Sequence, residues 1–152
     1  MDIRDRVPLS VQLVLASASP ARLSVLRAAG VRPVVQASTV DEDALIASAG
    51  SVPPGELVTV LARAKAADAA AGFADAVVVG CDSMLHIGGE LVGKPHTVDI
   101  ARERWAAMAG NSAELLTGRH RTGRGDQRIL VHSGHLYRRL YPGGLQHGQT
   151  RR

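Results

Sequence analysis

Two serines and an arginine occur where the sequence predicts that a strand ends and a helix begins. Residues 9–16 are largely apolar and predict a buried strand. Ser19 suits the N-cap of a following helix and Pro20 suits its first position. Ser17, Ser19 and Arg22 would then surround a helix N-terminus, whose free N–H groups and partial positive charge bind phosphate. Simple N-capping by Ser19, with Arg22 in solvent, explains the same residues equally well.

Two lysines could add positive charge to such a phosphate site. Lys65 lies beside the apolar face of a helix expected over residues 56–71. Lys94 lies between Gly93 and Pro95, which predict a tight turn with a fixed backbone. An ammonium group is a compact partner for phosphate, although a single lysine is most often a surface residue.

Carboxylates could supply the remaining chemistry. Asp82 follows the apolar run over residues 76–81, at the end of a predicted strand, where open α/β sheets bind their ligands. A turn-forming Asp that caps its own backbone is the alternative interpretation. Asp41, Glu42 and Asp43 form an acidic stretch that we expect to be a loop. Their oxygens suit a divalent cation, which phosphate chemistry generally needs, but a solvated loop is the simpler explanation.

The elements that would position these residues alternate between strand and helix. Strands are expected over residues 9–16, 32–37, 76–81 and 114–117, helices over 20–30, 56–71 and 98–108, and a hairpin over 84–92. Such an alternation indicates an α/β fold.

Composition narrows the class of protein. The chain has 152 residues, which favours a single domain, and its apolar share of 45% excludes a wholly disordered protein. No uncharged apolar run approaches the roughly 18 residues of a membrane-spanning helix, and the mixed-charge N-terminus is unlike a secretory signal. A single cysteine permits no internal disulfide. We therefore expect a cytoplasmic protein with no membrane partner.

Composition also changes abruptly after Gly118. Residues 1–118 contain 10 basic and 13 acidic side chains, whereas residues 119–152 contain 8 basic and 1 acidic and no alanine. Three explanations compete: an arm that binds nucleic acid, a disordered linker, and a stretch translated out of frame from a GC-rich gene. The third accounts for the most features, and we expect a basic, disordered and non-native tail.

Six short segments follow one another in a fixed order. They are Leu-Val-Leu-Ala-Ser-Ala-Ser-Pro-Ala-Arg (13–22), Ser-Thr-Val-Asp-Glu (38–42), Ala-Lys-Ala (64–66), Gly-Cys-Asp-Ser (80–83), Gly-Lys-Pro (93–95) and Leu-Thr-Gly (116–118). In this order the segments resemble the Maf family of nucleotide pyrophosphatases. The resemblance covers about 106 residues within 1–118.

The resemblance implies a fold and a reaction. The fold is α/β and similar to inosine triphosphatase, with a mixed sheet, flanking helices and a nucleotide cleft between two lobes. The reaction is hydrolysis of nucleoside triphosphates to monophosphate and pyrophosphate with Mg²⁺ or Mn²⁺. Asp82 matches the proton acceptor, and Glu42 matches an acidic residue that would help Asp82 to hold the metal. The phosphate-contacting positions are matched by Ser17, Ser19, Arg22, Lys65 and Lys94.

Two departures from the family pattern affect what can be expected. Ala21 replaces a second arginine and Ser83 replaces the usual threonine, at two positions that the family associates with base preference. After Gly118 the family's further strands are not visible, so residues 1–118 would be an incomplete domain with impaired activity. Reading the back-translated codons of residues 120–122 one base later permits Thr-Val-Leu, which supports the out-of-frame explanation.

Two functions therefore remain. The first is a nucleoside triphosphate pyrophosphatase, whose partners would be its substrate and at most a second copy of the chain in a homodimer. The second is a basic module that binds nucleic acid through residues 119–152. Apart from this second function, we do not expect nucleic acid to be a partner.

Overall fold

The computed structural model describes residues 11–123 and 129–136, and in the second range it describes the strand alone. Strands and helices form an α/β protein with a mixed sheet and flanking helices, as predicted. In order, the elements are β1 (Leu13–Ala16), α1 (Pro20–Ala28), β2 (Val34–Val35), α2 (Glu42–Ala49), α3 (Pro54–Ala70), β3 (Val77–Ile87), β4 (Glu90–Val92), α4 (Val98–Met108), β5 (Ala113–Thr122) and β6 (Ile129–Leu136). Within the described ranges, no helix has the length and apolar character needed to cross a bilayer.

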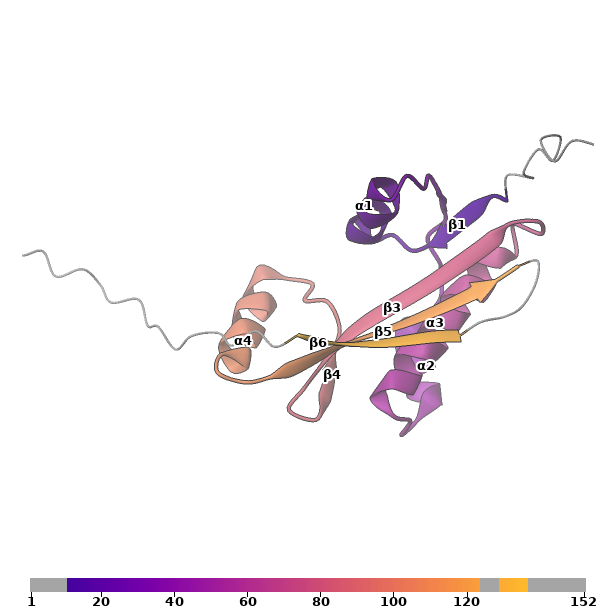
Figure 1. Ribbon diagram of the computed structural model, residues 1–152. Coiled ribbons are helices and arrows are strands. Elements are labelled where there is room, and N and C mark those ends of the chain that lie inside the picture. Colours follow the sequence, from indigo (N-terminus) through magenta and orange to yellow (C-terminus); the bar gives the residue numbers. More distant parts are fainter. Residues whose placement is uncertain (1–10, 124–128, 137–152) are drawn as a thin grey trace, which may run out of the picture.

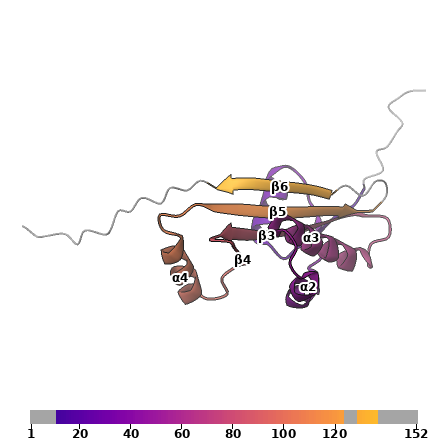
Figure 2. The same ribbon diagram turned by 90° about the horizontal axis from the view of Figure 1, so that it is seen from below.

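The strands form one sheet in the order β2-β1-β3-β5-β6, with β4 beside β3. β1 is parallel to β2 and β3, whereas β3 is antiparallel to β4 and β5, and β5 is antiparallel to β6. The long strands β3 and β5 carry α4 and β4 at one end and β1 and α1 toward the other (Figure 1). Figure 2 shows α2 and α3 together under one part of the sheet and α4 under the other. Strands β3 and β5 thus connect the part of the molecule that contains α4 with the part that contains α2 and α3.

The core lies between α3 and the sheet, where two glycines let the helix approach the strands closely. A Cβ added at Gly80 would overlap the carbonyl oxygen of Ala62 and lie 2.7 Å from the amide nitrogen of Ala66. A Cβ at Gly118 would overlap the backbone of Val58. The helix therefore packs backbone against backbone on β3 and β5, which fixes its side chains relative to both strands. Other buried apolar residues are Val14, Leu15, Ala16, Leu57, Leu61, Ala69, Ala76, Val78 and Leu116.

Helix α2 occupies part of the acidic stretch that the sequence predicts as a loop. The Asp41 carboxylate caps the helix and accepts the N–H of Ala44 at 2.9 Å. Glu42 and Asp43 lie in the first turn, where negative charge stabilises a helix, and Gly50 ends it with a φ of 63°. The loop prediction is therefore wrong from Glu42 onward, and the acidic run is a helix start.

Strand β3 is longer than the apolar run that predicts it. The prediction ends the strand at residue 81 and places Asp82 after it. In the structure β3 continues to Ile87, because β5 pairs with it from Val78 to His86. Asp82 therefore lies inside a strand, opposite Gly118 of β5.

The expected boundary at Gly118 also falls inside a strand. β5 pairs with β3 as far as Thr122, and β6 pairs with β5 over residues 129–136. Residues 119–122 and 129–136 are thus strands, although the sequence predicts disorder there. Strand pairing depends on backbone N–H and C=O groups, and residues 119–136 contain no proline that would remove an N–H donor. Residues 124–128 and 137–152 lie outside the described residues. The out-of-frame origin of the tail stays a prediction.

Candidate active site

The candidate site lies at a gap along one edge of β3. β1 pairs with this edge as far as Gly80, and β4 pairs with it from Leu85 onward, while β5 covers the opposite edge throughout. Residues 81–84 therefore face neither β1 nor β4. The loop that follows β1 and the turn that follows β4 enter the gap from its two sides.

A cavity of about 460 Å³ lies at this gap and is lined by side chains from distant parts of the sequence. Eight of the residues predicted to act on a nucleotide line it: Ser17, Ser19, Arg22, Glu42, Lys65, Asp82, Ser83 and Lys94. Ala21 does not line it; this residue is exposed on α1. The structure thus brings together the predicted phosphate-binding, proton-accepting and metal-binding positions in one cavity.

The start of α1 is ordered by the residues that were expected to bind an anion. The Ser19 hydroxyl caps the helix and accepts the N–H of Arg22 at 3.5 Å. The Arg22 guanidinium does not extend into solvent: it donates to Ser17 Oγ at 2.8 Å, to the Cys81 carbonyl at 3.1 Å and to Ser83 Oγ at 3.0 Å. Arg22 therefore binds the open edge of β3. Residues 17–22 thus both cap α1 and contribute side chains to the cavity.

Lys65 joins two carboxylates that also line the cavity. Its Nζ donates to Asp82 Oδ1 at 2.7 Å and lies 2.8 Å from Glu42 Oε1. The side chains of Lys65 and Asp82 are 12% and 9% exposed, whereas that of Glu42 is 50% exposed. Burial lowers the pKa of Lys65, but hydrogen bonds to the two carboxylates and their charges outweigh burial and raise this pKa above its ordinary value of 10.5. Lys65 is therefore protonated at neutral pH.

Asp82 retains an acceptor that the rest of the site does not use. Its Oδ2 is buried and has no hydrogen-bond partner among the described residues. Because an unpaired buried acceptor costs about 1–3 kcal/mol, such an atom indicates a place for a ligand, a proton donor or a cation. Two carboxylates around one ammonium group also leave this cluster with excess negative charge.

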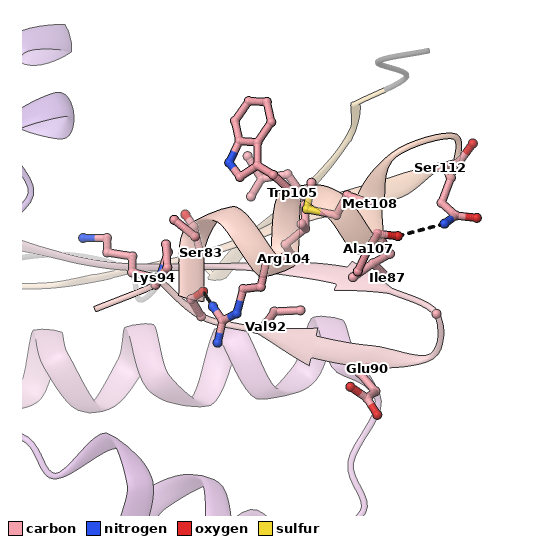
Figure 3. Close-up of a pocket in the computed structure, with 17 residues that line it drawn as sticks. Ser83, Ile87, Glu90, Val92, Lys94, Arg104, Trp105, Ala107, Met108 and Ser112 are labelled. Atoms are coloured by element: carbon pink, nitrogen blue, oxygen red, sulfur yellow. Dashed lines mark hydrogen bonds between the residues drawn. The ribbon is translucent and has the colours of Figure 1, made fainter. Parts of the chain in front are cut away.

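Arg104 lines the cavity as well, although nothing in the sequence distinguishes it from the other polar residues of α4. Its Nη1 donates to the Gly93 carbonyl at 2.7 Å and so ties α4 to the turn before Lys94 (Figure 3).

A second, more apolar cavity of about 1020 Å³ lies between α4 and the β3–β4 hairpin. Ser83, Gly93, Lys94 and Arg104 line both cavities, which are therefore neighbours.

Comparison with known proteins confirms the family that the six sequence segments resemble. The family model described as "Maf-like protein" matches residues 12–135. The chain belongs to the Maf family. The match includes every residue that lines the smaller cavity, and it extends past Gly118 through most of β6.

Three relatives of this Maf chain share the name nucleoside triphosphate pyrophosphatase. The protein of Rhodococcus opacus is 67% identical over 111 residues, that of Saccharopolyspora erythraea 59% over 113, and that of Mycobacterium tuberculosis 53% over 116. These alignments cover 69%, 71% and 70% of the Maf chain and 52%, 54% and 52% of the relatives. The Maf chain therefore spans about half the length of the curated relatives that it matches.

Proposed function

We propose that this Maf chain hydrolyses nucleoside triphosphates to nucleoside monophosphate and pyrophosphate. The observation that carries the proposal is the buried, unpartnered Oδ2 of Asp82 in a cavity that Arg22, Lys65, Lys94 and Arg104 also line. Cationic side chains bind phosphate oxygens, and a free carboxylate oxygen can accept a proton. The name shared by the relatives supports the same reaction.

Asp82 is the proton acceptor in this proposal. Lys65 holds Oδ1, so the carboxylate has a fixed orientation and Oδ2 is left to accept a proton from water. The water oxygen attacks the α-phosphorus, the bond from the α-phosphorus to the bridging oxygen breaks, and pyrophosphate leaves. A positioned proton acceptor typically contributes about 10²–10⁴ to the rate.

Glu42 and Asp82 fit a divalent cation, Mg²⁺ or Mn²⁺. The fit rests on the free Oδ2 of Asp82 and on the excess negative charge around Lys65. In the part of the chain that the structure describes, no group of three or more His, Cys, Asp or Glu gathers as a metal site. Two carboxylates agree with Mg²⁺, which proteins usually bind through one or two carboxylates plus substrate phosphates. When bound, the cation would neutralise charge on the phosphates.

The remaining predicted residues would bind or select the substrate. Ser17, Ser19 and Lys94 would contact the phosphates, and Arg22 would act from its position on the edge of β3. Ser83 would influence base preference from the cavity wall, where its hydroxyl shares a 3.0 Å hydrogen bond with Thr117. Ala21, which does not line the cavity, would do so from its position on α1 next to Arg22.

The test is pyrophosphate release from a panel of nucleoside triphosphates, with Mg²⁺ or Mn²⁺, by the wild type and by Asp82→Asn. Asparagine keeps the shape of the side chain but is a poor proton acceptor, so we expect turnover to fall at least about 100-fold. Asp99→Asn is the matched control, because the Asp99 side chain is 93% exposed on α4. Thermal unfolding of both variants confirms that the fold is retained. Wild-type turnover in Asp82→Asn would rule out the assignment of Asp82.

The nucleic-acid-binding function remains a prediction that we do not propose. It depends on the arginines of residues 119–152, most of which lie outside the described residues. Arg119 and Arg121 lie in β5. Cytoplasmic localisation, which the sequence predicts, and a homodimer remain proposals, and size-exclusion chromatography with light scattering tests the second.

A further inference from the structure

The cationic side chains of the cavity differ in how much of their hydrogen-bonding capacity is already used. Arg22 donates to three acceptors in the protein, and Lys65 is held between two carboxylates. Lys94 is exposed and has no hydrogen-bond or ion-pair partner among the described residues. Arg104 makes a single hydrogen bond there, to the Gly93 carbonyl. Among the described residues, Arg22 thus keeps two of its five N–H donors and Lys65 one of its three, whereas Arg104 keeps four and Lys94 all three. Lys94 and Arg104 therefore have the most unused donors.

Charge balance leads to the same pair. The positive charge of Lys65 is compensated by Glu42 and Asp82, whose carboxylates lie 2.8 and 2.7 Å from its Nζ. A triphosphate brings several further negative charges into this cavity. Besides Arg22, the cationic side chains that line the cavity and form no ion pair with a described residue are Lys94 and Arg104.

We infer that Arg104 is a substrate-binding residue that holds the polyphosphate chain together with Lys94. This inference rests on the proposed function. A guanidinium group has five N–H donors in a planar fork that matches two oxygens of one phosphate, and one of these donors is used here. The four other N–H donors remain for phosphate oxygens.

The bond to Gly93 also places Arg104 in advance. The side chain is half-buried and extends from α4 to the backbone after β4, where Figure 3 shows its hydrogen bond as a dashed line. Lys94 follows Gly93 directly, so one side chain fixes the backbone of the other. Because the Arg104 side chain is already held at the wall before the substrate arrives, binding needs little additional ordering of it.

The test is equilibrium binding of inorganic tripolyphosphate by calorimetry at fixed Mg²⁺ and ionic strength. A lost charge-assisted hydrogen bond predicts that Arg104→Gln weakens binding at least about tenfold. Arg102→Gln is the matched control, since Arg102 is a 78% exposed residue of the same helix and does not line the cavity. Equal affinities of Arg104→Gln and Arg102→Gln, with both variants folded by circular dichroism, would overturn the inference.

A double-mutant cycle separates direct binding from positioning of Lys94. If Arg104 contacts phosphate, Arg104→Gln weakens tripolyphosphate binding further in a Lys94→Gln background. If Arg104 acts solely through Lys94, the second substitution changes nothing in that background, and the inference is wrong. Arg104→Lys adds a check: an ammonium group keeps the charge but has one nitrogen in place of the planar fork, so we expect partial rescue of affinity.

Failure of this inference and failure of the proposed function are distinguishable. If no nucleotide releases pyrophosphate but Arg104→Gln still weakens tripolyphosphate binding, the proposed function fails and the binding role of Arg104 stands. If nucleotides are hydrolysed and Arg104→Gln binds like the wild type, the reverse holds.

Discussion

The contact between Lys65 and Asp82 makes a quantitative prediction about stability. Two unit charges 2.7 Å apart attract each other by roughly 6 kcal/mol at an effective dielectric constant of about 20, and desolvation of the two groups offsets much of this. Lys65→Met removes the ammonium group and leaves the Asp82 carboxylate, which is 9% exposed, without a charge partner. Removing one member of such a buried pair typically costs about 3–5 kcal/mol. Glu42 adds little, because half of its side chain is exposed to solvent.

We therefore expect Lys65→Met to lower the free energy of unfolding by about 3 kcal/mol at pH 7, which corresponds to a fall in Tm of roughly 10 °C. Urea denaturation and differential scanning calorimetry measure the two quantities. Lys94→Met is the control: Lys94 is exposed, so its replacement should change stability by less than about 0.5 kcal/mol.

A double variant shows whether the cost comes from the stranded carboxylate. Asn at position 82 carries no charge, so Lys65→Met combined with Asp82→Asn should be more stable than Lys65→Met alone, by about 1–2 kcal/mol. If Lys65→Met and Lys94→Met have the same stability, or if the double variant is the least stable of the set, the electrostatic account of this cluster is wrong.

Other predictions concern the core and the pH dependence of stability. Gly80→Ala should lower the free energy of unfolding by about 1–3 kcal/mol or prevent folding, because the new methyl group meets the backbone of α3; Gly72→Ala, with nothing within 4 Å of its Cβ, is the control, and equal urea midpoints would contradict the close packing. Burial and the charge of Arg63 lower the pKa of His120, so the unfolded state takes up a proton first as the pH falls. Stability should therefore be lost below about pH 6.5 and be less pH-dependent in His120→Gln; identical pH profiles from urea titrations would exclude this role.

Local signals in the sequence predict most of the elements and the residues of the site. Ser19 and Pro20 mark the start of α1, as their capping positions in the structure confirm, and α4 covers residues 98–108 as predicted. The start of α2 carries an equally good signal, since Asp41 precedes two acidic residues and Gly50 follows the helix. That signal was open to a second interpretation, because acidic residues at a helix start also resemble a cation site.

The length of β3 could not be predicted from local sequence. Its apolar run ends at Cys81, and the strand continues because β5 supplies backbone partners from a segment 28–36 residues further along the chain. Arg104 was missed for a related reason: its role depends on the fold of α4 against the turn at Gly93, and a helical arginine has no distinctive sequence environment. Pairing and docking between distant segments decide such features.

The gap in the sheet explains why the site combines a rigid carboxylate with an open edge. β5 pairs with β3 on both sides of Asp82, so this carboxylate lies on a strand with a fixed backbone. On the other edge β1 stops opposite Gly80, and the next carbonyl of β3, that of Cys81, is bound by Arg22. Arg22 thus replaces a missing strand partner while it lines the cavity. Arg22 reaches its three acceptors with two separate nitrogens, Nη1 and Nη2, and the one nitrogen of a lysine cannot take both positions, so Arg22→Lys should leave the strand edge partly unpaired. Stability and tripolyphosphate affinity should therefore fall together in Arg22→Lys, whereas Arg104→Lys should alter affinity alone.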